Sequence, residues 1–167
     1  MTLERVRSSV DKAVEWMLIV VFATMTLNVL WQVFTRFVLG DPSSYTEELA
    51  RYLLVWLGLL GGAYAVGKKM HLAIDIVPTL VKGRRRHMLE IFIQSSIFVF
   101  AIGIVLLGGL NLVGLTLTLR QVSAALQIQL GYVYLVLPVS GVLMMFYSGT
   151  YILESIGALR EDRHGMD

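Results

Sequence analysis

The sequence predicts an all-α integral membrane protein with four transmembrane helices, a short interfacial amphipathic helix, and both termini in the cytoplasm. Hydrophobic residues make up 56% of the chain and charged residues 16%, a balance that water-soluble domains of this size do not carry. Four apolar segments are long enough to cross the ~30 Å hydrocarbon core, which takes ~20 residues. Four crossings also place most basic residues on one side of the membrane.

We expect one membrane domain, residues 1–167, with four membrane-spanning segments. These segments are Val14–Leu39, Thr46–Val66, Met88–Leu119 and Ile128–Ser155. The first is too long and lacks the small-residue cleavage site of a signal peptide, so we expect it to be retained. Three of the segments exceed the minimum span, which implies tilt, extension beyond the hydrocarbon, or breaks. Gly108-Gly109 and Pro138 are the candidate breaks.

The orientation follows from the distribution of the fourteen Lys and Arg residues. Three lie before the first segment, six in the central loop and two in the tail, and only three lie elsewhere. The eleven are Arg5, Arg7, Lys12, Lys68, Lys69, Lys82, Arg84, Arg85, Arg86, Arg160 and Arg163. Because basic residues concentrate in cytoplasmic loops, both termini and the central loop are expected in the cytoplasm.

The central loop contains an amphipathic stretch at residues 72–82. Apolar residues alternate there with polar ones at helical spacing, which favours a helix lying in the membrane interface. Pro78 interrupts this stretch as a first helical position or a kink, and the alternation at 72, 74 and 76 leaves a strand open.

Polar residues recur every fourth position along the first segment, at Thr24, Asn28, Gln32 and Arg36. This spacing puts them on one helix face, which must contact protein because polar groups are costly in lipid. Near the start of the second segment, Glu47 and Arg51 are spaced for a local i,i+4 ion pair. Glu48 is then left for Arg36, which predicts an interhelical Arg36–Glu48 ion pair.

Two roles are open for the predicted Arg36–Glu48 pair. A proton or ion relay needs further carboxylates deeper in the membrane, whereas Glu90 and Glu154 fall near the predicted cytoplasmic ends. We therefore favour a structural pair that fixes helix orientation. Gly58 and Gly62 have the small-xxx-small spacing of close helix packing, although a chance match in a glycine-rich helix explains it equally well.

His71 and Asp75 have i,i+4 spacing, but two ligands are too few for a metal site. Interfacial contacts to lipid, backbone or a neighbouring chain fit them better. The basic clusters beside the membrane spans indicate topology and anionic lipids rather than nucleic acid. None of the phosphate-binding or catalytic motifs GxxxxGK[ST], GxGxxG, HExxH and GxSxG occurs, so we expect no enzyme, cofactor or metal.

The stretch Trp31–Asp75 reads WQVFTRFVLGDPSSYTEELARYLLVWLGLLGGAYAVGKKMHLAID. It resembles the small membrane subunit of tripartite ATP-independent periplasmic (TRAP) transporters, the DctQ-like family. The resemblance rests on Arg36, the Glu47-Glu48 pair, Trp56, the Gly-Ala run and His71…Asp75, in that order. It extends loosely over the whole chain, including the opening of the last helix at Gly131–Pro138, while Pro78 falls earlier than in the family.

The resemblance implies a transporter of the bacterial inner membrane with three parts. A periplasmic binding protein delivers an organic acid of the dicarboxylate or sialic acid class. A large membrane subunit carries it with sodium by an elevator movement, and the small subunit belongs to the fixed frame. The alternative is an autonomous channel or exporter that works as a homo-oligomer. A haem-binding membrane anchor is disfavoured because the three His residues, His71, His87 and His164, lie outside the predicted spans.

Overall fold

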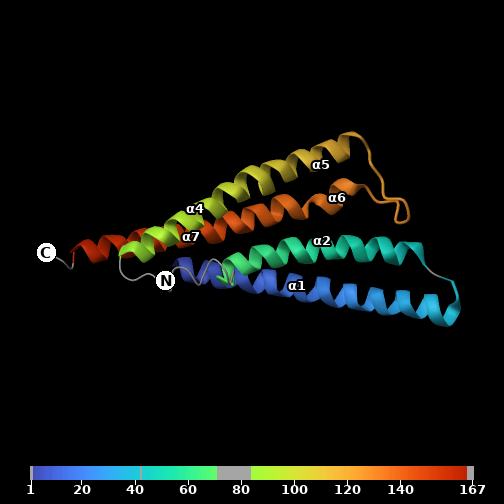
Figure 1. The fold of residues 1–167 in the computed structure, drawn as a ribbon. Coiled ribbons are helices and arrows are strands. Elements are labelled where there is room, and N and C mark those ends of the chain that lie inside the picture. The colour runs from blue at the N-terminus through green and yellow to red at the C-terminus, as the bar shows by residue number, and fades with distance from the viewer. Residues whose placement is uncertain (1, 42, 71–83, 165–167) are drawn as a thin grey trace. The chain divides into compact units, whose positions relative to one another are not determined.

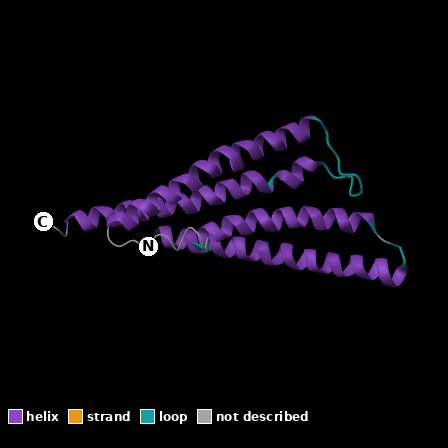
Figure 2. Cartoon of the chain, in the orientation of Figure 1, coloured by secondary structure: helices purple, strands orange, loops and turns teal. Residues whose placement is uncertain are grey.

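The computed structural model describes residues 2–41, 43–70 and 84–164. Helices make up nearly all of this part of the chain (Figures 1 and 2). The predicted interfacial segment 72–82, together with His71 and Asp75, lies outside the described residues. The described ranges contain no β-strand, and Val122 and Gln129 form a single antiparallel bridge.

In the described part of the chain, four long helices are apolar enough to span a membrane, which confirms the predicted number. The first consists of α1 (Thr2–Phe34) and a π-helical continuation, η1 (Thr35–Leu39). The second is α2 (Ser44–Gly67). The third runs through α4 (Arg84–Phe100), π-helical η2 (Ala101–Gly108) and α5 (Gly109–Thr118), and the fourth consists of α6 (Leu130–Tyr134) and α7 (Val136–His164). The candidate membrane spans are Glu4–Leu39, Ser44–Gly67, Arg85–Thr118 and Leu130–Leu159.

Both predicted break points coincide with a change in helical geometry. The fourth helix is interrupted at Leu135, between α6 and α7. Pro138 explains this interruption because a proline ring clashes with the carbonyl group four residues earlier, here that of Tyr134. At Gly108-Gly109 the third helix continues, but its winding changes from π-helical to α-helical.

The chain divides into two compact units. The first unit contains residues 1–62 and Gly109–Leu137, hence α1, most of α2, α5 and α6. In this unit α1 and α2 run antiparallel (Figure 1), and α6 packs closely on α5. A Cβ atom added to Gly131 would lie 2.4 Å from Leu117 Cγ, so only glycine fits this contact between α5 and α6 without a shift of the leucine.

The second unit contains Ala63–Gly108 and the chain from Pro138 onward, hence the end of α2, α4, η2 and α7. Its buried centre includes Tyr147 and Ser148 of α7, both fully buried. Gly141 of α7 lies against the backbone of Leu106, since an added Cβ would be 3.0 Å from the Leu106 nitrogen. Small residues thus permit close helix packing here, as in other membrane proteins.

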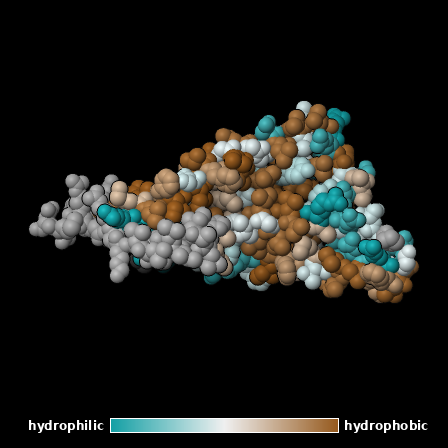
Figure 3. Space-filling model, viewed as in Figure 1, coloured by the Kyte–Doolittle hydropathy of each residue, from teal (hydrophilic) through white to brown (hydrophobic). Residues whose placement is uncertain are grey.

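The surface over the helices is mainly hydrophobic, as Figure 3 shows. On the face shown, hydrophilic residues gather mainly at the end that carries the α1–α2 and α5–α6 connections. Large apolar side chains of α1 and η1 are exposed, including Trp16 at 67%, Leu27 at 68% and Phe37 at 76%. Lipid or another protein chain must cover such a surface, because water does not solvate it favourably.

Candidate functional site

The connection between α5 and α6 is an ordered hairpin-like loop. The Ser123 amide donates to the Ile128 carbonyl at 2.8 Å, and the Leu130 amide donates to the Gln121 carbonyl at 2.9 Å. Arg120 and Gln127 adopt positive φ angles of 49° and 56°, which reverse the chain direction at the two sides of the loop. The tight turn leaves the amides of residues 124–126 pointing in a common direction.

Glu48, in the second turn of α2, binds this loop through its carboxylate. Its Oε1 atom accepts from the Ala124 amide at 3.1 Å, and its Oε2 atom accepts from the amides of Ala125 at 2.7 Å and Leu126 at 2.9 Å. The Tyr52 hydroxyl, one turn along α2, donates to Oε1 at 2.7 Å. Four donors therefore surround one carboxylate, an arrangement in which successive backbone amides form an anion-binding nest.

Further hydrogen bonds hold the same unit together. The indole Nε1 of Trp56 donates to the Val133 carbonyl at 2.9 Å, which joins α2 to α6. The side-chain amide of Asn28 donates to the Thr46 carbonyl at 2.8 Å, which joins α1 to α2. With Glu48, these bonds connect three helices and the α5–α6 loop through α2.

The structure gives Glu48 a partner other than the predicted one. Arg36 lies in η1, is exposed, and has its guanidinium carbon 5.7 Å from the centre of the Phe37 ring. Within the described ranges, no ion pair joins Arg36 to Glu48. The predicted Arg36–Glu48 pair is corrected accordingly, because three loop amides and Tyr52 already fill the acceptor positions of the Glu48 carboxylate.

The structure shows the predicted local pair at the start of α2. Arg51 Nη2 lies 3.3 Å from Glu47 Oε1, and both side chains are about two-thirds exposed. An exposed i,i+4 pair of this kind contributes little to stability, about 0.3–0.5 kcal/mol. The two neighbouring glutamates of α2 thus differ in their partners. Glu47 forms an ion pair with a residue of its own helix, whereas Glu48 accepts hydrogen bonds from the α5–α6 loop.

The polar stripe on the first helix divides between internal and interhelical contacts. The Thr24 hydroxyl donates to the Val20 carbonyl within α1, and Thr24 is exposed. Asn28 contacts α2, as described above. Gln32 is half-buried, and its backbone carbonyl accepts from the Thr35 hydroxyl at 3.0 Å. Among the four residues of the stripe, Asn28 alone forms a side-chain hydrogen bond to another helix within the described part of the chain.

Of the two glycines singled out by spacing, Gly58 makes no close contact within the chain. Gly58 is exposed, and nothing lies within 4 Å of a Cβ added there. Gly67, at the end of α2, instead faces Tyr147, whose ring atoms would lie 2.7 Å from an added Cβ. The sequence contains no signal for this contact, because its partner is 80 positions away in α7.

The end of α2 carries further contacts to α7 in the second unit. The Tyr151 hydroxyl donates a hydrogen bond to the Gly67 carbonyl. Lys69 Nζ lies 4.3 Å from the centre of the Tyr151 ring, a cation–π distance. Tyr147 and Tyr151 thus hold the carboxyl end of α2, where Lys69 takes a left-handed φ of 52°.

Among the residues that the structure describes, no group of three His, Cys, Asp or Glu side chains is placed to hold a metal ion. The carboxylate of Glu48 faces amide and hydroxyl donors, so it is occupied in positioning a loop.

Comparison with known families identifies the type of chain that carries this arrangement. The sequence model of the DctQ component of tripartite ATP-independent periplasmic transporters matches residues 25–157. The chain belongs to the DctQ family. The matched range includes Glu48, the α5–α6 loop and most of the four membrane-spanning helices, so it is a multi-pass membrane protein of this transporter family.

The chain is similar to several proteins that are named as TRAP transporter permease proteins. The chain is 29% identical over 108 residues to the sialic acid TRAP transporter small permease protein SiaQ of Vibrio cholerae, covering 65% of this chain and 62% of SiaQ. It is 32% identical over 90 residues to the sialic acid TRAP transporter permease protein SiaT of Haemophilus influenzae, covering 54% of this chain but 15% of SiaT. It is 22% identical over 107 residues to the C4-dicarboxylate TRAP transporter small permease protein DctQ of Vibrio cholerae, covering 64% of this chain and 46% of that protein. The chain spans less than two thirds of each of these relatives.

Proposed function

We propose that this DctQ-family chain is the small subunit of a TRAP transporter and serves as a fixed membrane frame for a large permease subunit. The large subunit would carry an organic acid, of the dicarboxylate or sialic acid class, together with sodium. A periplasmic binding protein would deliver the substrate. The chain itself would catalyse no reaction and bind no cofactor.

The observation that carries this proposal is that the region similar to this chain occurs both in a small permease protein and within a much longer permease protein. In SiaQ the matched region makes up most of a chain named a small permease protein. In SiaT it occupies 15% of a much longer permease protein. A region that occurs both as a separate chain and within a longer permease is expected to work in contact with the rest of that permease.

The structure supports a frame in two respects. The contacts of Glu48, Trp56 and Asn28 use long-range hydrogen bonds to hold helices and a loop in place. The exposed apolar side chains of α1 offer an extended surface for a membrane partner. Gly58 and Gly62 belong to the same proposal, because the open space at Gly58 leaves room for a helix of another chain.

Transport measurements test the proposal directly. Liposomes containing this chain, its large permease subunit and the binding protein should take up substrate along a sodium gradient, and omission of any one component should abolish uptake. The tagged chain should also retain the large subunit during purification. Uptake by liposomes that contain this chain alone would contradict the frame and favour an autonomous channel or exporter. Uptake that needs all components but no sodium gradient would contradict only the proposal that sodium is the coupling ion.

We further propose that the chain lies in the bacterial inner membrane with both termini in the cytoplasm. The support is the concentration of Lys and Arg in the amino-terminal, central and carboxyl-terminal parts of the sequence. The α5–α6 loop anchored by Glu48 would then face the periplasm.

Cysteine labelling provides the test of this orientation, because the chain contains no cysteine of its own. In intact cells with a permeabilised outer membrane, a membrane-impermeant maleimide should label a Gln121→Cys variant at the exposed α5–α6 loop. It should label a Ser8→Cys variant only after the inner membrane is opened. Leu27→Cys, on the apolar surface of α1, serves as the unlabelled control. The opposite labelling order would refute the orientation.

A further inference from the structure

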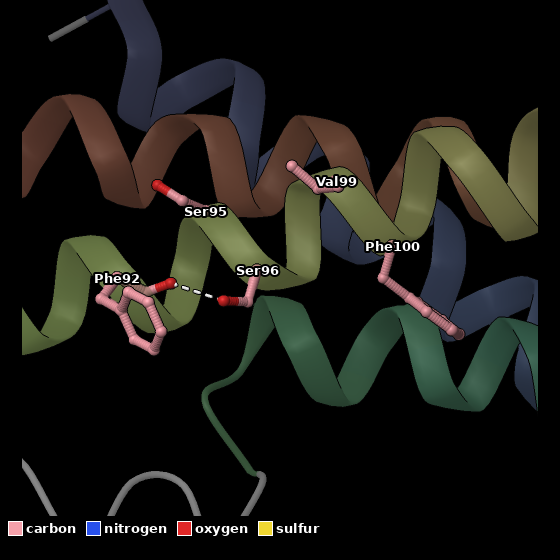
Figure 4. Close-up of a pocket in the computed structure, with 5 residues that line it drawn as sticks. All are labelled: Phe92, Ser95, Ser96, Val99 and Phe100. Atoms are coloured by element: carbon pink, nitrogen blue, oxygen red, sulfur yellow. Dashed lines mark hydrogen bonds between the residues drawn. The ribbon is translucent and has the colours of Figure 1, made fainter.

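An open groove runs along the surface of α4 in the second unit, with a volume of about 440 Å³. Five residues line it, and all of them come from this helix (Figure 4). They are Phe92, Ser95, Ser96, Val99 and Phe100. Phe92 and Phe100 lie at the two ends of the lined stretch, with the serines and Val99 between them.

The groove presents mainly carbon to its occupant. Phe92 is 70% exposed and Val99 is 68% exposed. The Ser96 hydroxyl already donates to the Phe92 carbonyl at 2.9 Å (Figure 4), so its hydrogen-bonding capacity as a donor is used within the helix. An apolar chain can therefore occupy the groove without leaving this donor unpaired.

A cation lies beyond one end of the groove on the same helix face. Arg85 precedes Phe92 by seven residues, about two turns and about 10 Å along the helix axis. The exposed side chain of Met88 lies between them along the helix. Arg86 and Glu90 form an ion pair at 3.5 Å, whereas Arg85 is exposed and has no ionic partner among the described residues.

Arg85 is the first residue of the third candidate span, which continues to Thr118. At 34 residues this helix is longer than the ~20 residues that the hydrocarbon core requires, so its Arg85 end can reach the headgroup region. A cation at this level is attracted to anionic lipid, and the apolar groove continues from it into the core.

We propose that this face of α4 binds one anionic phospholipid, with its phosphate at Arg85 and an acyl chain in the groove from Phe92 to Phe100. A phospholipid carries a negative charge and a long apolar chain in the order that Arg85 and the groove require. An apolar helix of a partner protein would fill the groove but would also have to place a carboxylate opposite Arg85, whereas one anionic phospholipid carries both the charge and the apolar chain. The inference requires only that the chain lies in a membrane, so it does not depend on the proposed transport role.

Lipid binding to the purified full-length chain in detergent tests this site. The probes are phosphatidylglycerol and phosphatidylcholine with identical dioleoyl chains, and native mass spectrometry measures how much of each lipid is retained. Phosphatidylglycerol should be retained preferentially. Arg85→Gln should weaken its retention about fivefold, as expected for the loss of one basic residue near a lipid surface. Arg120→Gln, which alters an exposed arginine of the α5–α6 loop, should leave retention unchanged.

A second variant tests the acyl chain separately from the charge. Ser96→Trp places a large side chain in the groove and should also weaken retention, whereas Val20→Trp, on the exposed surface of α1, should not. Thermal unfolding confirms that each variant is folded. Glycerol phosphate, which has a headgroup charge and no acyl chain, should compete poorly with the lipid.

Three results would overturn the proposal. Equal retention of the two lipids would remove the anionic specificity. Unchanged retention in Ser96→Trp, or strong competition by glycerol phosphate, would show that lipid retention depends on charge alone and that no acyl chain binds in the groove. Loss of the large permease subunit from Ser96→Trp, with lipid retention unchanged, would assign the groove to a protein helix.

Discussion

Replacing Glu48 with alanine should lower the free energy of unfolding more than any other substitution in the first two turns of α2, because the carboxylate accepts hydrogen bonds from three loop amides and one hydroxyl and its loss leaves these donors unpaired. The variant leaves the amides of Ala124, Ala125 and Leu126 without their acceptor. Reversible unfolding of the purified chain in mixed micelles measures the change. Hydrogen exchange at these three amides should accelerate at the same time.

Neighbouring substitutions give this prediction its controls. Glu47→Ala removes a glutamate of the same helix turn that forms only an exposed ion pair, so it should cost less than about 1 kcal/mol. Tyr52→Phe removes one of the four donors and should cost about 1 kcal/mol. Equal losses for Glu47→Ala and Glu48→Ala would show that the loop contact does not stabilise the fold.

Replacing Gly67 with alanine should destabilise the chain by about 1–3 kcal/mol, the usual cost of excess volume in a packed interior. The added Cβ would lie 2.7–2.9 Å from three ring atoms of Tyr147. Tyr147 is fully buried, so its ring has little room to move. The same unfolding measurement in mixed micelles detects the loss.

A double-mutant cycle shows whether the clash is the cause. In a Tyr147→Ala background the Gly67→Ala substitution should cost little, since the ring that it meets is gone. Gly58→Ala is the matched control on the same helix, where an added Cβ meets no atom within 4 Å. Alanine favours helices over glycine by about 1 kcal/mol, so this control should be neutral or slightly stabilising. An undiminished cost of Gly67→Ala beside Tyr147→Ala would refute the steric explanation.

The sequence was sufficient to predict features that depend on composition or local spacing. Four spans follow from hydrophobicity because the bilayer imposes a minimum length on every crossing. The Glu47–Arg51 pair follows from i,i+4 spacing, and the interruption near Pro138 follows from the geometry of proline. Each of these depends on residues that are close together along the chain.

Contacts between residues far apart in the chain could not be predicted from composition or local spacing. The partner of Glu48 is a backbone turn 76–78 residues away, and backbone amides carry no sequence signature. Charge pairing alone therefore favoured Arg36. Similarly, small-xxx-small spacing singled out Gly58, where an added Cβ would meet no atom within 4 Å, whereas a close contact is made at Gly67, against the ring of Tyr147. The π-helical winding of η1 and η2 had no expected signal either.

The long sequence separation of the Glu48 contact has a consequence for biogenesis. When α1 and α2 leave the ribosome, the turn that receives the carboxylate has not yet been synthesised. Until that turn is made, Glu48 of the first helical hairpin lacks its three amide donors. Capture of the 124–126 turn then becomes possible only after the third span has entered the bilayer. The hydrogen bonds of the Glu48 carboxylate therefore form late in insertion, and they are present only in a chain whose third span is already in the bilayer.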